Sequence, residues 1–118
     1  MTNKQFNKFV KEFRRNQDEL ITLKGFDYTQ GDSDRLHNFK FVAEHTGLTP
    51  VQVWSVYWLK HVLAILTFVK HGEVRSESIE GRFLDEANYN LLGLAILKEQ
   101  QLDVHSRRRK ANKRKTRK

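Results

Sequence analysis

Residues 49–72 read TPVQVWSVYWLKHVLAILTFVKHG and carry the clearest helix signals in the chain. Thr49 offers a side-chain oxygen to the free N–H groups of a first turn, and proline is favoured at the position that Pro50 would take. Gly72 suits the left-handed residue that ends many helices. Apolar residues cover nearly the whole circumference between these ends. The pattern predicts a helix over 50–71, buried at the centre of the fold.

Three further segments repeat apolar residues at steps of three and four, the period of an amphipathic helix. We expect helices over about 3–24, 34–45 and 77–102, with Gly25 ending the first and Gly47 ending the second. Only 38% of the 118 residues are hydrophobic, so the core that one chain can build is small. The sequence therefore predicts an all-α, four-helix bundle that oligomerisation completes.

The composition and the lengths of the apolar runs bear on where in the cell the protein is found. The chain has no cysteine, which removes disulfides, thiolate metal sites and a cysteine nucleophile. The longest strictly apolar run, residues 62–66, is far shorter than the roughly 20 residues of a membrane span. Residues 1–11 are polar and lack the apolar centre of a signal peptide. We expect a cytoplasmic protein that has no membrane partner.

Positive charge is concentrated at one end. Residues 107–118 hold nine lysines and arginines and no acid, whereas residues 1–106 hold 13 basic and 14 acidic residues. Such a block cannot bury apolar surface, so we expect a helical domain over 1–106 and a disordered basic tail over 107–118. The tail either binds nucleic acid by releasing counterions or only keeps the chain soluble. Its nucleic-acid contacts would be Arg107, Arg108, Arg109, Lys110, Lys113, Arg114 and Lys115.

Polar residues interrupt the apolar helix predicted over 50–71. Lys60 and His61 lie at its middle, and Trp54, Tyr57 and Trp58 share a face with His61 at 100° per residue. A buried lysine without a partner is costly, so Lys60 either extends to solvent or meets an acid or an anionic ligand. His61 is either a hydrogen-bonded core residue or a ligand contact.

The last predicted helix gathers polar residues on adjacent faces. Glu77, Asp85 and Asn88 fall within roughly 80° of one another, and Arg82 lies on the neighbouring stripe with Asp85 and Tyr89. These residues either form surface pairs worth a few tenths of a kcal/mol or line a polar pocket facing the helix of Lys60 and His61. No P-loop, dinucleotide-binding or HExxH motif is present, and the five histidines lack the spacing of metal ligands on one helix face.

Several short motifs share an order and spacing with a known family. They are Lys24-x-x-Asp27-Tyr28, Asp34-x-Leu36-x-Asn38-Phe39, Gly47-x-Thr49-Pro50, Lys60-His61 and Ser76-Glu77-x-Ile79-x-Gly81-Arg82-x-x-Asp85-x-x-Asn88-Tyr89. Over about residues 20–100 the chain resembles small phage-type, nucleotide-modification-associated domains of the MazG-like, all-α kind. The resemblance implies a MazG-like helical homo-oligomer that handles nucleotides, in the host bacterial cytoplasm if a phage encodes it.

The chain departs from this family where the family's hydrolases hold magnesium. MazG-like pyrophosphatases carry acidic ExxE-type and ExxD sets on two core helices, whereas here residues 50–71 contain no acid and the second set is Asp85-x-x-Asn88. Lysine and histidine in place of the acids favour direct binding of phosphate without a cofactor. If the chain is an enzyme, Glu77 and Asp85 would hold Mg²⁺, completed by Glu80 or Asp27.

The resemblance thus implies a nucleotide site between the third and fourth helices. Lys60 and Arg82 would contact phosphate oxygens, with the arginine bidentate. The remaining expected contacts, to phosphate, base or ribose, are Lys24, Asp27, Tyr28, Asn38, Trp58, His61, Asp85, Asn88 and Tyr89.

Three functions remain open at this point. The first is a nucleotide-binding protein that sequesters a host immune nucleotide and so acts as an anti-defence sponge. The second is a metal-dependent nucleotide pyrophosphatase. The third is a nucleic-acid binder in which the basic tail makes the contacts and the bundle is an oligomerisation scaffold.

Overall fold

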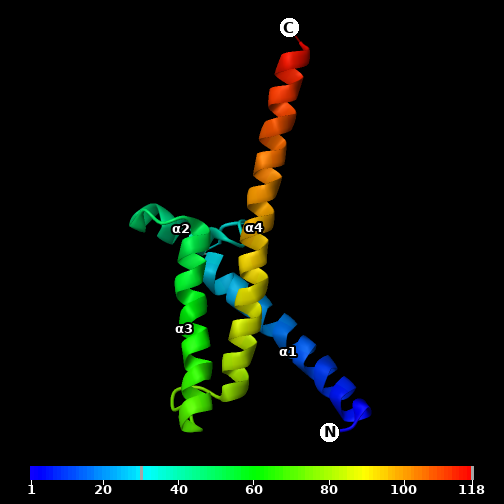
Figure 1. Cartoon of the computed structure of the whole chain (residues 1–118), viewed down its shortest axis with the longest axis vertical. Coiled ribbons are helices and arrows are strands. Elements are labelled where there is room, and N and C mark those ends of the chain that lie inside the picture. Colours follow the sequence, from blue (N-terminus) through cyan, green and yellow to red (C-terminus); the bar gives the residue numbers. More distant parts are fainter. Residues whose placement is uncertain (30, 118) are drawn as a thin grey trace.

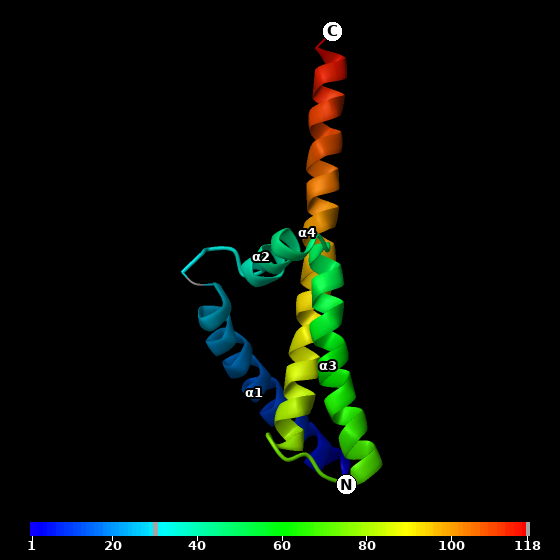
Figure 2. The ribbon, with the colours of Figure 1, turned by 90° about the vertical axis from the view of Figure 1, so that its left-hand side faces the viewer.

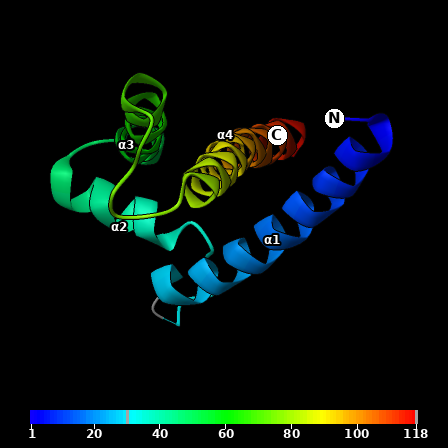
Figure 3. The same ribbon diagram turned by 90° about the horizontal axis from the view of Figure 1, so that it is seen from below.

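The computed structural model describes residues 1–29 and 31–117, which form an all-α fold (Figure 1). Its helices are α1 (Asn3–Thr29), α2 (His37–Thr46), α3 (Pro50–His71) and α4 (Ile79–Thr116). The α3 and α4 helices run antiparallel side by side, and α4 continues well past the end of this pair (Figures 1 and 2). Seen from below, α4 lies between α3 on one side and α1 on the other (Figure 3).

The helix ends follow the sequence signals closely at α2 and α3. Thr49 accepts a hydrogen bond from the backbone N–H of Gln52, while the Gln52 side chain accepts one from the Thr49 N–H. This reciprocal capping box fixes where α3 begins. Gly47 and Gly72 end α2 and α3 with φ of 75° and 78°, the left-handed conformation that glycine adopts without a steric penalty. The predicted bounds of α3 are confirmed.

Gly25 does not end the first helix, which corrects the sequence prediction. It is a buried residue inside α1, and a Cβ added there would lie 2.8 Å from Nε of Arg35. The Arg35 side chain crosses α1 at this point and donates a hydrogen bond to the backbone oxygen of Ile21 at 3.3 Å. The glycine therefore allows a close approach between α1 and the segment leading into α2.

The hydrophobic core lies where α2 crosses the first turns of α3 and the middle of α4. Its fully or nearly buried members are Leu36, Phe39, Ala43, Val53 and Ile96. Trp54 packs beside this core and lies flat on α4, so a Cβ on Gly93 would lie only 2.4 Å from the indole Cε2 atom. The Trp54 Nε1 atom donates to the backbone oxygen of Tyr89 at 2.6 Å. This contact fixes the spacing between α3 and α4.

The prediction that α3 is the buried central helix is wrong. Val53 is its one buried residue, because α3 packs along its length on α4 alone and meets α2 only near its start. By length and composition α3 could cross a membrane, and only 6% of that apolar window is buried in the fold.

The basic segment is helical here, which differs from the disorder expected from its charge. The α4 helix runs from Ile79 to Thr116 without interruption and therefore includes residues 107–116. Arginine, lysine and alanine are good helix formers, and neither glycine nor proline follows Gly93. The cations are consequently displayed on an exposed helix that extends beyond the other three (Figure 1).

Candidate functional site

A polar cluster is enclosed between α1, α2 and α4. Lys24 of α1 donates to Asp85 of α4 across 2.7 Å, and Asp85 is only 7% exposed. Sixty-one positions separate the two residues, so the pair ties the last turns of α1 to the second turn of α4. Asp85 lies on the flank of α4 next to α1 and is within about 40° of Tyr89, which contacts α3.

Two asparagines in the same cluster have side-chain atoms that make no hydrogen bond. Asn88 is 3% exposed, yet both its Oδ1 and its Nδ2 lack a partner, as does Oδ1 of Asn38. The cavity beside them holds about 10 Å³, which suits a single water molecule and no larger ligand. Six of the predicted site residues line this cavity: Lys24, Tyr28, Asn38, Asp85, Asn88 and Tyr89.

His61 joins this cluster from α3. Its ring lies 4.5 Å from the ring of Tyr89, between centroids. Burial lowers the pKa of His61 below 6.5, an effect that nearby Asp85 opposes and Lys24 and Arg82 reinforce. Burial also raises the pKa of Tyr89 to about 12. At neutral pH, His61 is therefore uncharged and Tyr89 keeps its phenolic proton.

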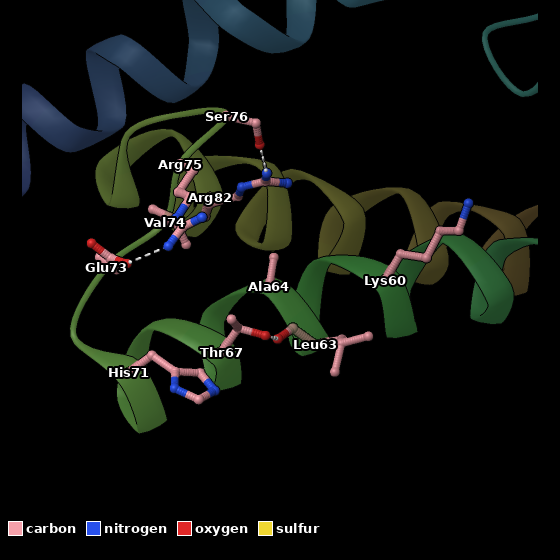
Figure 4. Close-up of a pocket in the computed structure, with 10 residues that line it drawn as sticks. All are labelled: Lys60, Leu63, Ala64, Thr67, His71, Glu73, Val74, Arg75, Ser76 and Arg82. Carbon is pink, nitrogen blue, oxygen red and sulfur yellow. Dashed lines mark hydrogen bonds and ion pairs between the residues drawn. The ribbon is translucent and has the colours of Figure 1, made fainter.

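The large opening in this region is a groove of about 690 Å³, walled by the second half of α3, the connection over 72–78 and the first turns of α4 (Figure 4). Its charged members are Lys60, Arg75 and Arg82 against the single acid Glu73, and His71 adds an imidazole. Thr67 and Ser76 supply hydroxyls. The groove therefore presents an excess of positive charge and hydrogen-bond donors.

Arg82 is the best-positioned cation in this groove. One guanidinium nitrogen donates to Ser76 Oγ at 2.6 Å, as Figure 4 shows, while Nε is buried without a hydrogen-bond partner and lies 3.9 Å from the Glu77 carboxylate. Arg75 is paired with Glu73 at 3.3 Å in the connection. Lys60 stands at the opposite end, with its amine directed away from Arg82 (Figure 4). The guanidinium thus has donor capacity left for a ligand.

The residues predicted to form one site are consequently divided between two places. Lys60 and Arg82 line the groove, whereas Lys24, Asn38 and Asp85 belong to the closed cluster on the α1 side of α4. No single pocket between α3 and α4 brings together all eleven residues among those that the structure describes.

Trp58 and Asp27 lie outside both places. The Trp58 indole stacks on Trp54, and its Nε1 donates to Glu86 and Asn90 at 3.2 and 3.0 Å. Asp27 is exposed and lines a shallow hollow of about 130 Å³ near the start of α2. A base-stacking role for Trp58 would require that it leave these partners.

The carboxylates that the resemblance assigns to magnesium are engaged in other pairs. Asp85 is bound to Lys24, and Glu77 precedes the Ser78 N-cap of α4 and faces Arg82. Glu80 lies in the first turn of α4 and is exposed. Over residues 1–29 and 31–117, no three histidine, aspartate or glutamate side chains gather as a metal site. As arranged here these side chains do not fit a magnesium ion, and we assign them no metal-dependent step.

Two of the ten residues that line the groove, Lys60 and Arg82, are predicted from the sequence, and eight are not. Three polar residues among these eight are His71, Arg75 and Ser76. They sit at the end of α3 and in the connection, where no helical period applies. The sequence feature that could have indicated them is the presence of two basic side chains and a serine within residues 71–76.

Comparison of the chain with protein-family models, with curated proteins and with solved structures finds no match. The fold and the site are described by the structure alone: the chain is all-α and has a cationic groove and a buried polar cluster.

Proposed function

We propose that the groove binds a small phosphorylated nucleotide and that the chain sequesters this nucleotide without cleaving it. The observation that carries the proposal is the Arg82 guanidinium, which lines a cationic groove and whose Nε atom is buried without a hydrogen-bond partner. The volume of the groove, about 690 Å³, lies within the range of roughly 300–1,000 Å³ that is typical of small-ligand sites.

The charges of the groove favour a phosphate group as the part recognised first. The planar guanidinium of Arg82 can donate two parallel hydrogen bonds to phosphate oxygens. The Lys60 amine points away from Arg82, so it would have to turn into the groove to add its charge (Figure 4). Thr67 and Ser76 can donate hydroxyl hydrogens to the remaining oxygens. Leu63, Ala64 and Val74 give an apolar wall for the nucleoside.

Capture fits these side chains better than hydrolysis. The lining contains one carboxylate, Glu73, and that group is already paired with Arg75. A general base for hydrolysis would have to be this paired carboxylate or the His71 imidazole at the end of α3. The closed cluster around Lys24 and Asp85 takes a structural role in this proposal, because it fixes the α1 helix against α4.

The test is isothermal titration calorimetry of the full chain with ADP, ADP-ribose and cyclic di-AMP, with and without Mg²⁺. Arg82→Gln should weaken binding about 10- to 100-fold, the loss typical of a charge-assisted hydrogen-bond pair. Arg15→Gln, at an exposed arginine of α1, is the matched control and should bind as the parent does. Equal affinity in Arg82→Gln and the parent would refute the groove as the site. Metal-dependent turnover would instead favour the pyrophosphatase.

A second candidate function, nucleic-acid binding, follows from the helical display of the basic segment. The cations over 107–117 are exposed on the free end of α4, where a duplex could approach them. Replacing Arg107, Lys110 and Arg114, which share one face of α4 at 100° per residue, by glutamine should reduce the slope of log affinity against log salt by about 2.7 for duplex DNA. An unchanged slope would remove the basic helix as the contact surface.

A further inference from the structure

The outer side of α3 carries an unpartnered apolar stripe. Val56, Leu59, Leu63 and Leu66 are each at least half exposed, and Leu63 reaches 63%. Their spacing of three, four and three residues repeats over two heptads, which is the pattern of a coiled-coil seam. We call these four residues the α3 seam.

The α3 seam faces away from the rest of the fold. Trp54 and His61 contact Tyr89 of α4, and at 100° per residue they lie on the opposite side of α3 from the seam. Figures 1 and 3 show the same arrangement, with α4 and α1 both on one side of α3. No other element that the structure describes packs along the seam.

The exposed area of the chain exceeds what a compact monomer of this mass shows. The surface measures 9614 Å², against about 6,700 Å² expected for 14.0 kDa. The radius of gyration is 18.9 Å, against about 13.5 Å for a compact domain of this length. Part of this excess belongs to the free ends of α1 and α4. A stable dimer buries about 800 Å² on each partner, which is less than the whole excess.

We infer that a second copy of this chain packs against the α3 seam, forming a two-fold antiparallel helix pair. The three-four-three spacing is the same in both directions, so such pairing sets Leu59 against the partner's Leu63 and Val56 against the partner's Leu66. The sequence predicts an oligomer but no contact surface for it, and the α3 seam provides that surface. It does not depend on which ligand the groove takes.

A second copy fits the seam better than a lipid bilayer does. Lys60 and His61 stand at the middle of α3, and α4 carries Arg82, Asp85 and Glu86 alongside it. Inserting this helix pair would place those charges in hydrocarbon. The two tryptophans of α3 also stack on each other and hydrogen-bond to α4, and so do not form an interfacial belt.

The seam also borders the groove, since Leu63 belongs to both and Lys60 lies beside it. A second copy would therefore add a wall to each groove. Dimerisation and ligand binding remain separable, because Arg82 lies on α4 and outside the seam.

The first experiment is light scattering after size-exclusion chromatography on the full chain. The parent should elute at twice 14.0 kDa or an even multiple of it, and Leu59→Glu/Leu63→Glu should halve that mass while its circular dichroism stays helical. Leu102→Glu, at a 70% exposed leucine of α4, is the matched control and should keep the parent's mass. A monomeric parent, or a double variant that keeps the parent's mass, would overturn the inference.

A second experiment tests the pairing directly. The chain has no cysteine, so Leu59→Cys mixed with Leu63→Cys should cross-link under mild oxidation, and Glu44→Cys mixed with Leu63→Cys should not. Equal cross-linking in both mixtures would contradict the antiparallel pairing. Flotation of the full chain with phosphatidylcholine vesicles, together with a monomeric mass, would assign the seam to a membrane instead.

Discussion

Replacing Gly93 by alanine tests the packing of α3 on α4. The new Cβ would lie 2.4, 2.5 and 2.9 Å from the Cε2, Cζ2 and Nε1 atoms of the Trp54 indole. The ring cannot move freely, because Nε1 is hydrogen-bonded to the backbone oxygen of Tyr89 and the indole stacks on Trp58 at 5.6 Å between centroids. The substitution therefore either displaces the indole or separates the two helices.

The expected loss of stability is about 2 kcal/mol. Overpacking costs typically about 1–3 kcal/mol, and the contact at 2.4 Å places this site at the upper end. Alanine recovers about 1 kcal/mol through its higher helix propensity. For a chain of this length, about 2 kcal/mol corresponds to a decrease of about 6–10 °C in the melting temperature.

Thermal unfolding followed by circular dichroism measures this effect, at one protein concentration because self-association would shift the transition. The control is the same change in a Trp54→Leu background, where the clash is gone and only the propensity gain remains. There Gly93→Ala should be neutral or stabilising by about 1 kcal/mol. A higher melting temperature for Gly93→Ala in the parent background would refute the close contact between Trp54 and α4.

Three further predictions concern caps and buried charges. Lys24→Met should destabilise the fold by about 3 kcal/mol in chemical denaturation, since it leaves Asp85 buried without a cation, and Lys24→Met/Asp85→Asn should recover part of that loss. Thr49→Ala should cost about 1 kcal/mol in the same assay by removing the cap of α3, and an unchanged midpoint would count against the capping box. Burial lowers the pKa of His61, so the unfolded chain binds its proton more readily. Stability should therefore decrease as the pH falls through about 6.5, and His61→Phe should weaken this dependence in melting curves between pH 7.5 and 5.5.

Local sequence signals predict where the helices begin and end, but they predict poorly which helices pack against one another. The bounds of α3 follow from Thr49, Pro50 and Gly72, because caps are chemical properties of adjacent residues. Burial of α3 does not follow, since periodicity reports which residues are apolar and not how many helices cover them. Gly25 shows the same limit, because a glycine that ends a helix and one that admits Arg35 are identical in sequence.

The candidate site also has a part that local sequence signals predict and a part that depends on tertiary contacts. The stripe of Asp85 and Asn88 on α4 is visible at helical spacing, and both residues are buried. Asp85 pairs with Lys24, which is 61 positions away in the sequence, and a local sequence pattern cannot predict such a pair. The groove depends on the path of the connection over 72–78, so Arg75 and Ser76 enter it through tertiary structure alone.

Capture and release of a nucleotide tests the central claim most directly. The purified full chain is incubated with a mixture of cyclic and linear nucleotides, with and without Mg²⁺, then washed and heated, and the released molecules are identified by mass spectrometry. We predict that the parent and Arg15→Gln release an intact nucleotide and that Arg82→Gln releases little or none. A parent that captures nothing, or one that returns a converted nucleotide only with metal, would contradict the account.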